Sequence, residues 1–253
     1  MAEYKPAIVL ITGATGDFGK AFANRFAGIG SKLILHGRNQ AKVDTLCAHY
    51  PDAHGIVFDM ADKAAMKAAL DALPESYKNI DVLINNAGLA LGLEPAHEAN
   101  LDDWETMIDV DIKGLVSMTR FVVNGMAERS SGHIINIGST AGSYPYAGGN
   151  AYCASKAFVK QFSLSLRADL AGKNIRVTNL EPAQVETQFS LVRFKGDADR
   201  AAKVYEGTKS LTADDVAEAA VWAATLPPHV NINRIEIMPT CQYPAGLAVH
   251  RSS

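Results

Sequence analysis

The sequence predicts an α/β fold in which a doubly wound parallel sheet of about seven strands carries helices on both faces. Short apolar segments alternate with helical segments six times along the chain. The apolar segments lack the polar alternation of half-exposed strands, which indicates strands that are buried on both sides. No linker, internal repeat or low-complexity segment interrupts this order. We therefore expect one domain over residues 1–253.

The first strand is expected at residues 7–11 (AIVLI), and a glycine-rich turn separates it from a helical segment at residues 20–30. The same patterns predict further strands at residues 32–36, 55–58, 81–88, 133–139, 175–182 and 234–239. Helices are expected at residues 40–50, 62–73, 101–127, 151–170 and 212–226, the last with a capped start. Residues 186–210 carry more charge and little periodicity, which is typical of a mobile segment over a site.

Composition argues for a small-molecule ligand. The formal net charge is -3 and no run of Lys or Arg is present, which disfavours nucleic acid or an anionic membrane as partner. Residues 7–11 are too short to span a membrane, and no signal-peptide pattern follows them, so we expect a cytoplasmic protein. Cys47, Cys153 and Cys241 are too widely separated to indicate a disulfide framework or a metal site.

The best candidate for chemistry is the stretch at residues 139–156, where a strand gives way to a helix. Tyr152 and Lys156 are four residues apart, so they lie on one helix face with Cβ atoms about 5–6 Å apart. A tyrosine has a pKa of about 10 and must lose roughly three units to exchange protons near neutral pH, and the Lys156 ammonium can supply part of that. Taken alone, the pair also fits an ordinary helical contact.

The turn after the first strand has the glycine spacing of a dinucleotide site, with Gly13, Gly16 and Gly19 allowing a pyrophosphate to approach the backbone at a helix N-terminus. An NAD site places an acid at the end of the second strand, whereas this chain has Arg38 nearby. We read Arg38 as a partner for the 2′-phosphate of NADP, the alternative being a solvated loop arginine. Asp59 either accepts a hydrogen bond from the adenine or caps the next helix.

Three motifs together resemble the short-chain dehydrogenase/reductases over nearly the whole chain: TGATGDFG at residues 12–19, NNAG at residues 85–88, and Ser139 with Tyr152 and Lys156. The resemblance implies a Rossmann-type fold, a homotetramer and an enzyme acting on CH–OH or C=O. In such enzymes the tyrosine protonates the carbonyl oxygen during reduction, the serine hydrogen-bonds that oxygen, and the lysine holds the nicotinamide ribose. The cofactor residues it implies are Gly13, Thr15, Asp17, Phe18, Gly19, Arg38, Asp59, Asn86, Tyr152, Lys156, Pro182, Val185 and Thr187.

Within the family, segments such as NNAGLALGLEPAHEA and VRFKGD are similar to bacterial NADP-dependent 3-hydroxy acid dehydrogenases that also oxidise serine and allo-threonine. The implied substrate is a short 3-hydroxy acid or a semialdehyde such as malonic semialdehyde. Its anion needs a partner, for which Arg193 is the first candidate, and Tyr144, Tyr146, Gln184 and Ser139 are candidates to line the pocket. Two alternatives remain: a reductase of a sulfonated aldehyde such as sulfoacetaldehyde, and a non-catalytic NADP-binding regulatory protein.

The chain departs from the family pattern at three places. Asp17 occupies a position where the family turn has glycine, and it either faces the pyrophosphate or caps the helix. Asp111 replaces the asparagine of the N-x-x-G pattern that belongs to the proton relay through Lys156. Pro182 is followed by Ala183 where the family has glycine.

Overall fold

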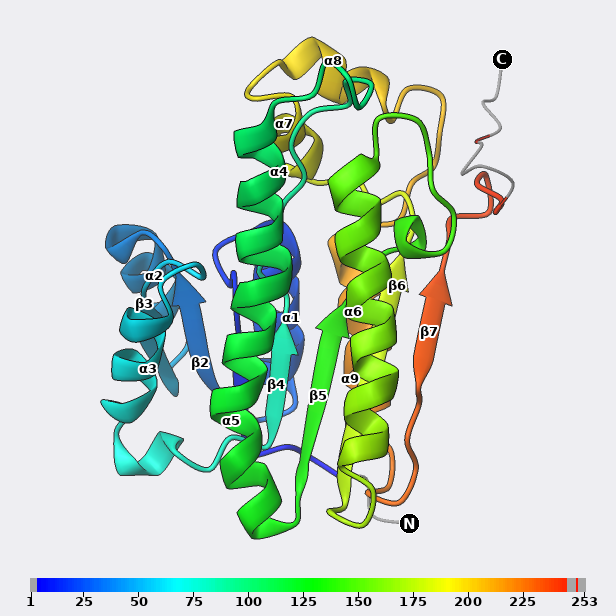
Figure 1. Ribbon diagram of the computed structural model, residues 1–253. Helices are drawn as coiled ribbons and strands as arrows, with labels where there is room; N and C mark the ends of the chain where they lie inside the picture. The colour runs from blue at the N-terminus through cyan, green and yellow to red at the C-terminus, as the bar shows by residue number, and fades with distance from the viewer. Residues whose placement is uncertain (1–3, 245–248, 250–253) are drawn as a thin grey trace.

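A computed structural model describes residues 4–244 and residue 249 of the chain (Figure 1). Within the described residues, strands in the order β3-β2-β1-β4-β5-β6-β7 form one sheet, and all neighbouring pairs are parallel. The predicted fold class is therefore confirmed. In chain order the strands are β1 (Ile8–Ile11), β2 (Lys32–Gly37), β3 (Ala53–Val57), β4 (Val82–Asn85), β5 (Gly132–Ile137), β6 (Ile175–Pro182) and β7 (Arg234–Ile237).

Helices cover the sheet on both sides (Figure 1). Apolar side chains of α1, α2 and α9 form the core on one face, and those of α3, α5 and α6 contribute to the core on the other. The α-helices are α1 (Asp17–Gly28), α2 (Gln40–Cys47), α3 (Lys63–Asp71), α4 (Leu101–Ile108), α5 (Leu115–Arg129), α6 (Asn150–Asp169), α7 (Phe189–Arg193), α8 (Ala198–Lys203) and α9 (Ala213–Thr225). Shorter turns are η1 (Glu75–Tyr77), η2 (Asp109–Gly114) and η3 (Thr140–Gly142).

Strand β1 shows why an inner strand can be apolar at every position. Val9 and Ile11 belong to the core under α1 and α9, whereas Ile8 and Leu10 belong to the opposite core. Successive side chains of a strand point to opposite faces, so a strand covered on both faces buries all of them. Complete burial of such a side chain stabilises the fold by about 1.5–3 kcal/mol.

Because the strands are parallel, their carboxyl ends lie along one edge of the sheet. The chain runs outward from β1 to β2 and β3, then crosses back to β4 on the other side of β1. Loops therefore diverge between β1 and β4, and this switch point is where open α/β sheets bind ligands.

Two segments differ from the sequence prediction. The single helix expected at residues 101–127 is interrupted by η2, a π-helical turn between α4 and α5. Hydropathy does not reveal this turn, because its cause is tertiary: the Asp111 side chain is buried, and Gly114 packs against Met60. The aperiodic residues 186–210 contain the short helices α7 and α8.

No helix within the described part of the chain combines the length and the apolar character needed to cross a membrane.

Candidate active site

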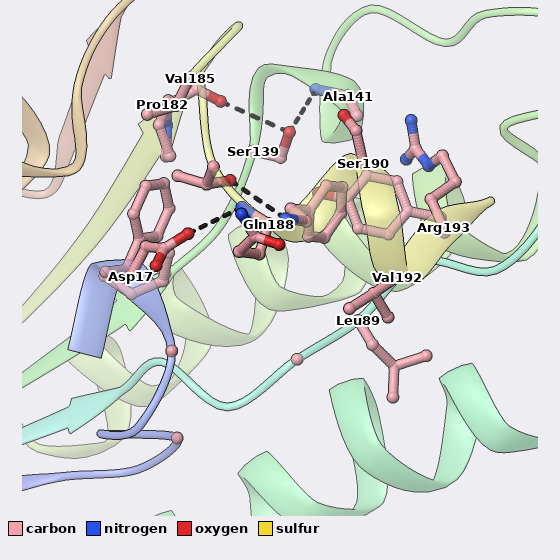
Figure 2. A pocket seen from close by; sticks show the side chains of 18 of the residues that line it. Asp17, Leu89, Ser139, Ala141, Pro182, Val185, Gln188, Ser190, Val192 and Arg193 are labelled. Carbon is pink, nitrogen blue, oxygen red and sulfur yellow. Dashed lines mark hydrogen bonds between the residues drawn. The ribbon is translucent and has the colours of Figure 1, made fainter. Parts of the chain in front are cut away.

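A cavity of about 740 Å³ opens at the carboxyl edge of the sheet, between the glycine-rich turn and the α7–α8 segment (Figure 2). It brings together most of the residues predicted from the sequence. Those that line it are Gly13, Thr15, Asp17, Phe18, Arg38, Asp59, Asn86, Ser139, Tyr146, Tyr152, Lys156, Pro182, Gln184, Val185, Thr187 and Arg193. Gly19, Asp111 and Tyr144 lie outside its lining as the described residues form it.

The glycine-rich turn between β1 and α1 leaves no room for a side chain at Gly13 or Gly19. Gly13 has a φ of +64°, and a Cβ on it would lie 3.0 Å from the Ala87 Cα. A Cβ on Gly19 would lie 2.4 Å from both the Ala14 Cα and the Gly13 carbonyl oxygen. The turn thus lies close against the first turn of α1, and its glycines Gly13 and Gly16 line the cavity. This cradle fits a pyrophosphate, which the N-terminal end of a helix attracts.

Two side chains hold the turn from behind. Asn86, after β4, donates from Nδ2 to the carbonyl oxygens of Thr12 at 2.8 Å and Gly13 at 3.2 Å. His36, in β2, accepts the Gly13 N–H at Nδ1 (3.2 Å), and its Nε2 donates to the Phe58 carbonyl (3.0 Å). Only the neutral ring with its proton on Nε2 makes both bonds. Burial lowers the pKa of His36 to about 4, which keeps the ring in that form at neutral pH.

His36 supports the glycine-rich turn, although no sequence motif singles it out. His36 is the last residue of the strand expected at residues 32–36. The available signal is a polar side chain ending an otherwise apolar strand, beside the glycine-rich turn.

Arg38 and Asp59 stand at the end of the cavity beyond β2 and β3. Arg38 Nη1 and Asp59 Oδ2 are 4.0 Å apart, and both side chains are exposed, so the pair contributes little to stability and leaves the guanidinium accessible. The capping alternative for Asp59 is wrong. The N-cap of α3 is Asp62, and Asp59 instead accepts the N–H of Ala61 in the turn before it.

Ser139 and Tyr152 lie at the opposite end, on the loop after β5 and the first turn of α6. Ser139 Oγ accepts the N–H of Ala141 at 3.1 Å. Tyr152 is buried, and burial raises the pKa of its phenol to about 12, while the charge of Arg193 and a hydrogen bond with Ser139 act in the lowering direction. Tyr152 therefore carries its proton at neutral pH.

Lys156 reaches the cavity one helical turn beyond Tyr152. Its Nζ donates to the Ile137 carbonyl at 3.1 Å and lies 5.7 Å from the centre of the Tyr152 ring. The helical spacing predicts Lys156 as the cation that lowers the pKa of Tyr152. In this structure the charge with the largest lowering effect on the pKa of Tyr152 is that of Arg193.

Asp111 sits behind Lys156 in the π-helical turn. Its two carboxylate oxygens accept hydrogen bonds from the Leu89 N–H at 2.9 Å and the Ser155 hydroxyl at 3.1 Å. A Cβ on Gly88 would lie 3.2 Å from Asp111 Oδ1 and 3.4 Å from Lys156 Nζ, so these two groups flank the same glycine. Burial raises the pKa of Asp111, and the Lys156 charge opposes that rise.

Arg193, the last residue of α7, places a cation beside Tyr152. Its Nη2 donates to the Tyr146 hydroxyl at 2.7 Å, and its guanidinium carbon lies 5.0 Å from the centre of the Tyr152 ring and 5.1 Å from that of Phe189. Aromatic faces attract such a cation and hold its plane. Arg193 thus lies where an anionic group of a bound substrate would meet it.

The remaining substrate candidates have different positions. Gln184 lines the cavity, where its Nε2 donates to the Val204 carbonyl at 2.7 Å and so links β6 to the end of α8. Tyr144 instead donates to Glu236 Oε1 at 3.3 Å, outside the lining. Phe189 is a further residue of the site, and its ring lies 5.6 Å from that of Tyr152. The aperiodic residues 186–210 give no pattern that would single it out.

Within the described residues, no group of three or more His, Cys, Asp or Glu side chains is placed to hold a metal ion.

Known proteins resemble this chain over most of its length. The family model described as short chain dehydrogenase matches residues 7–197. The chain is 57% identical over 250 residues to the NADP-dependent 3-hydroxy acid dehydrogenase YdfG of Salmonella typhi, covering 97% of this chain and 100% of that one. It is 47% identical over 246 residues to a serine 3-dehydrogenase of Rhizobium radiobacter, covering 97% of this chain and 98% of that one.

Solved structures show the same likeness. The closed form of serine dehydrogenase complexed with NADP+ superposes with a TM-score of 0.93 at 55% identity, covering 97% of this chain and 100% of that one. The crystal structure of serine dehydrogenase from Escherichia coli superposes with a TM-score of 0.83 at 50% identity, covering 93% and 99%.

Proposed function

Since this chain belongs to the short-chain dehydrogenase family and is an oxidoreductase, we propose that it uses NADP(H) to interconvert a short 3-hydroxy acid and its carbonyl partner, such as malonic semialdehyde. The observation that carries the proposal is the position of Arg193, whose guanidinium carbon is 5.0 Å from the Tyr152 ring. When the anionic group of a substrate binds Arg193, a carbonyl or hydroxyl oxygen a few atoms along the substrate can reach Tyr152. Relatives named for 3-hydroxy acids and serine support that substrate class.

The glycine-rich turn after β1 and the residues after β2 would form the binding site for the cofactor. The backbone of Gly13 and the start of α1 would hold the pyrophosphate, and Arg38 would meet the 2′-phosphate. Lys156, Val185 and Thr187 line the same cavity and would contact the nicotinamide half of the cofactor. Bound NADPH supplies the hydride that reaches the carbonyl carbon.

Tyr152 and Ser139 handle the substrate oxygen. With a pKa of about 12, Tyr152 is protonated at neutral pH, so it donates its proton to the oxygen that gains negative charge during reduction. The Ser139 hydroxyl hydrogen-bonds the same oxygen. Once Tyr152 has lost its proton, the positive charges of Lys156 and Arg193 stabilise the phenolate. In the oxidative direction the phenolate takes the proton back from the hydroxyl.

The test is NADPH oxidation with malonic semialdehyde and sulfoacetaldehyde in parallel. We expect turnover of malonic semialdehyde, a loss of at least about a hundredfold in kcat for Tyr152→Phe, and a tenfold or larger rise in KM for Arg193→Met. Tyr144→Phe and Arg200→Met are matched controls, because Tyr144 and Arg200 do not line the cavity. Full activity of Tyr152→Phe contradicts the mechanism, and an unchanged KM of Arg193→Met contradicts the substrate class.

A sulfonated aldehyde is the second candidate, because the same contacts of Arg193 and the Tyr146 hydroxyl suit a sulfonate as well as a carboxylate. A higher kcat/KM for sulfoacetaldehyde in the parallel assay decides for it. Tight NADPH binding with no turnover of any small carbonyl compound favours a regulatory protein instead.

We also propose that residues 1–253 form one dinucleotide-binding and catalytic domain, that it acts in the cytoplasm, and that it assembles as a homotetramer. Large apolar side chains on α4 and α6 support the assembly, since Ile108 is 40% exposed, Phe158 37% and Leu164 43%. Light scattering coupled to size-exclusion chromatography tests it. A monomeric mass contradicts the tetramer.

A further inference from the structure

Asp111 is the departure from the family pattern that changes the charge beside Lys156 and Tyr152. The other added acid, Asp17, accepts the Gln188 N–H at 2.7 Å and is not the N-cap of α1, a position that Gly16 holds. Asp111 is 1% exposed and lies in the π-helical turn η2. This buried carboxyl has no part in the proposed proton transfer.

Hydrogen bonds hold Asp111 in a fixed place relative to Tyr152. One carboxylate oxygen accepts the Leu89 N–H at 2.9 Å, and the other contacts the Ser155 hydroxyl at 3.1 Å. The Ser155 Oγ also contacts the Tyr152 carbonyl oxygen at 2.9 Å. The same hydroxyl therefore bridges the carboxyl and the first turn of α6.

The charge that acts on Asp111 is that of Lys156. The two groups flank Gly88, where a Cβ would lie 3.2 Å from Asp111 Oδ1 and 3.4 Å from Lys156 Nζ. Both side chains are buried, so water and salt screen their interaction little. The Lys156 ammonium is thus shared between two acidic groups, Asp111 on one side and Tyr152 on the other.

The Asp111 carboxyl loses its proton at lower pH than the Tyr152 phenol. The ordinary pKa is 3.8 for the carboxyl and 10.0 for the phenol; burial raises both, and Lys156 opposes the rise for the carboxyl. Tyr152 therefore ionises beside an existing carboxylate. That carboxylate offsets part of the Lys156 charge and also repels the phenolate, and both effects keep the phenol protonated.

We propose that the Asp111 carboxylate offsets part of the Lys156 charge and thereby raises the pH at which Tyr152 changes from proton donor to proton acceptor. Asp111 does not line the cavity, so it is a positioning residue that acts through Lys156 and Tyr152. The inference rests on the proposed function, since it takes Tyr152 as the group that exchanges a proton with the substrate. The other ionisable groups around Tyr152 come from α6, α7 and the loop before α6, and they are Lys156, Cys153, Arg193 and Tyr146.

The pH dependence of kcat/KM tests the proposal, because it reports the ionisation of groups in the enzyme that receives the substrate. Oxidation of 3-hydroxypropionate with saturating NADP+ is followed between about pH 6 and 10.5 at constant ionic strength. In the wild type the rate should rise with pH as Tyr152 loses its proton. In Asp111→Asn the same rise should lie about one pH unit lower, because a buried negative charge is removed. Asp111→Ser, which is also neutral and keeps an acceptor, should move the rise in the same direction.

Asp109→Asn is the matched control, because Asp109 is an acid of the same π-helical turn that pairs with Lys113 on the surface. It should keep the wild-type profile. A second measurement needs no turnover. It is the ultraviolet absorbance of the Tyr152 phenolate, obtained by subtracting the spectrum of the same protein with Tyr152→Phe. At about pH 10.5 this signal should be at least roughly threefold larger in Asp111→Asn than in the wild type.

A profile of Asp111→Asn that coincides with the wild type overturns the proposal. A move of the rise to higher pH also overturns it. That move is expected of a purely structural role, because a displaced Lys156 would no longer favour the phenolate. A larger phenolate signal without turnover of any substrate supports the action of Asp111 on Tyr152 and rejects the proposed function. Turnover that requires Tyr152, with profile and signal both unchanged in Asp111→Asn, supports the proposed function and rejects the action of Asp111.

Discussion

The neutral state of His36 makes the stability of this fold depend on pH in the acid range. The ring is 1% exposed, stacks on Phe58 at 4.0 Å between centres, and uses both nitrogens in hydrogen bonds. Its pKa falls from 6.5 to about 4 on folding. As the pH drops below 6.5, His36 binds a proton in the unfolded chain but not in the folded chain. The free energy of unfolding therefore decreases down to about pH 4 and then levels off.

The magnitude follows from the shift. A difference of about 2.5 units at 1.36 kcal/mol per unit corresponds to roughly 3.4 kcal/mol, or about 1.4 kcal/mol per pH unit between pH 6 and 4.5. This is a large part of the 5–15 kcal/mol that stabilises a typical domain.

The assay is urea unfolding at fixed protein concentration and several pH values between about 7.5 and 4.5, for the wild type and for His36→Gln. Glutamine cannot titrate, and all other ionisable groups, including the buried His133, are common to both proteins. The difference between their unfolding free energies should therefore shrink by about 1.4 kcal/mol per pH unit as acid is added. A difference that stays constant across this range refutes the reasoning.

Further predictions concern three other positions. Arg38→Asp should weaken NADPH binding at least about tenfold while changing NADH binding less, and equal losses in fluorescence titrations contradict the 2′-phosphate assignment. Gly19→Ala should destabilise the protein by more than about 2 kcal/mol in urea and abolish cofactor binding, because its Cβ would lie 2.4 Å from the Ala14 Cα; a fully stable variant with normal NADPH affinity contradicts the tight-turn model. Folding raises the pKa of Asp111, so its ionisation costs stability as pH rises; Asp111→Asn should gain stability relative to the wild type more at pH 7 than at pH 4, and a pH-independent gain contradicts the buried-charge account.

The fold and the residues at the two ends of the cavity can be predicted from the sequence, because they depend on local sequence patterns. Continuous apolar strands require burial on both faces, and Tyr152 and Lys156 share a face of α6 at a spacing fixed by helix geometry. The glycine spacing at Gly13 and Gly19 likewise follows from what a backbone cradle demands. Each of these features is set within one element or between successive ones.

Contacts between segments that are distant in the sequence could not be predicted from the sequence patterns. The bond from Gln188 to Asp17 joins residues 171 positions apart, and no pattern in either segment announces it. The same holds for His36, whose two hydrogen bonds come from the turn after β1 and the end of β3. Tyr144 shows the converse, since proximity in sequence to Ser139 suggested a place in the pocket that its bond to Glu236 does not give it.

The number of residues in the π-helical turn η2 sets how α4 and α5 are rotated relative to each other. Met107 before the turn packs in the cluster that contains Tyr152, whereas Met118 after it packs in the core against the sheet. Each residue of a helix advances by about 100°, so deleting a single residue from η2 would rotate α4 against α5 by that angle. One of the two methionines would then point into solvent. A one-residue deletion here should thus be tolerated worse than a conservative substitution in the same turn. A change of helical register near residue 111 would also disturb the cluster in which Tyr152 packs.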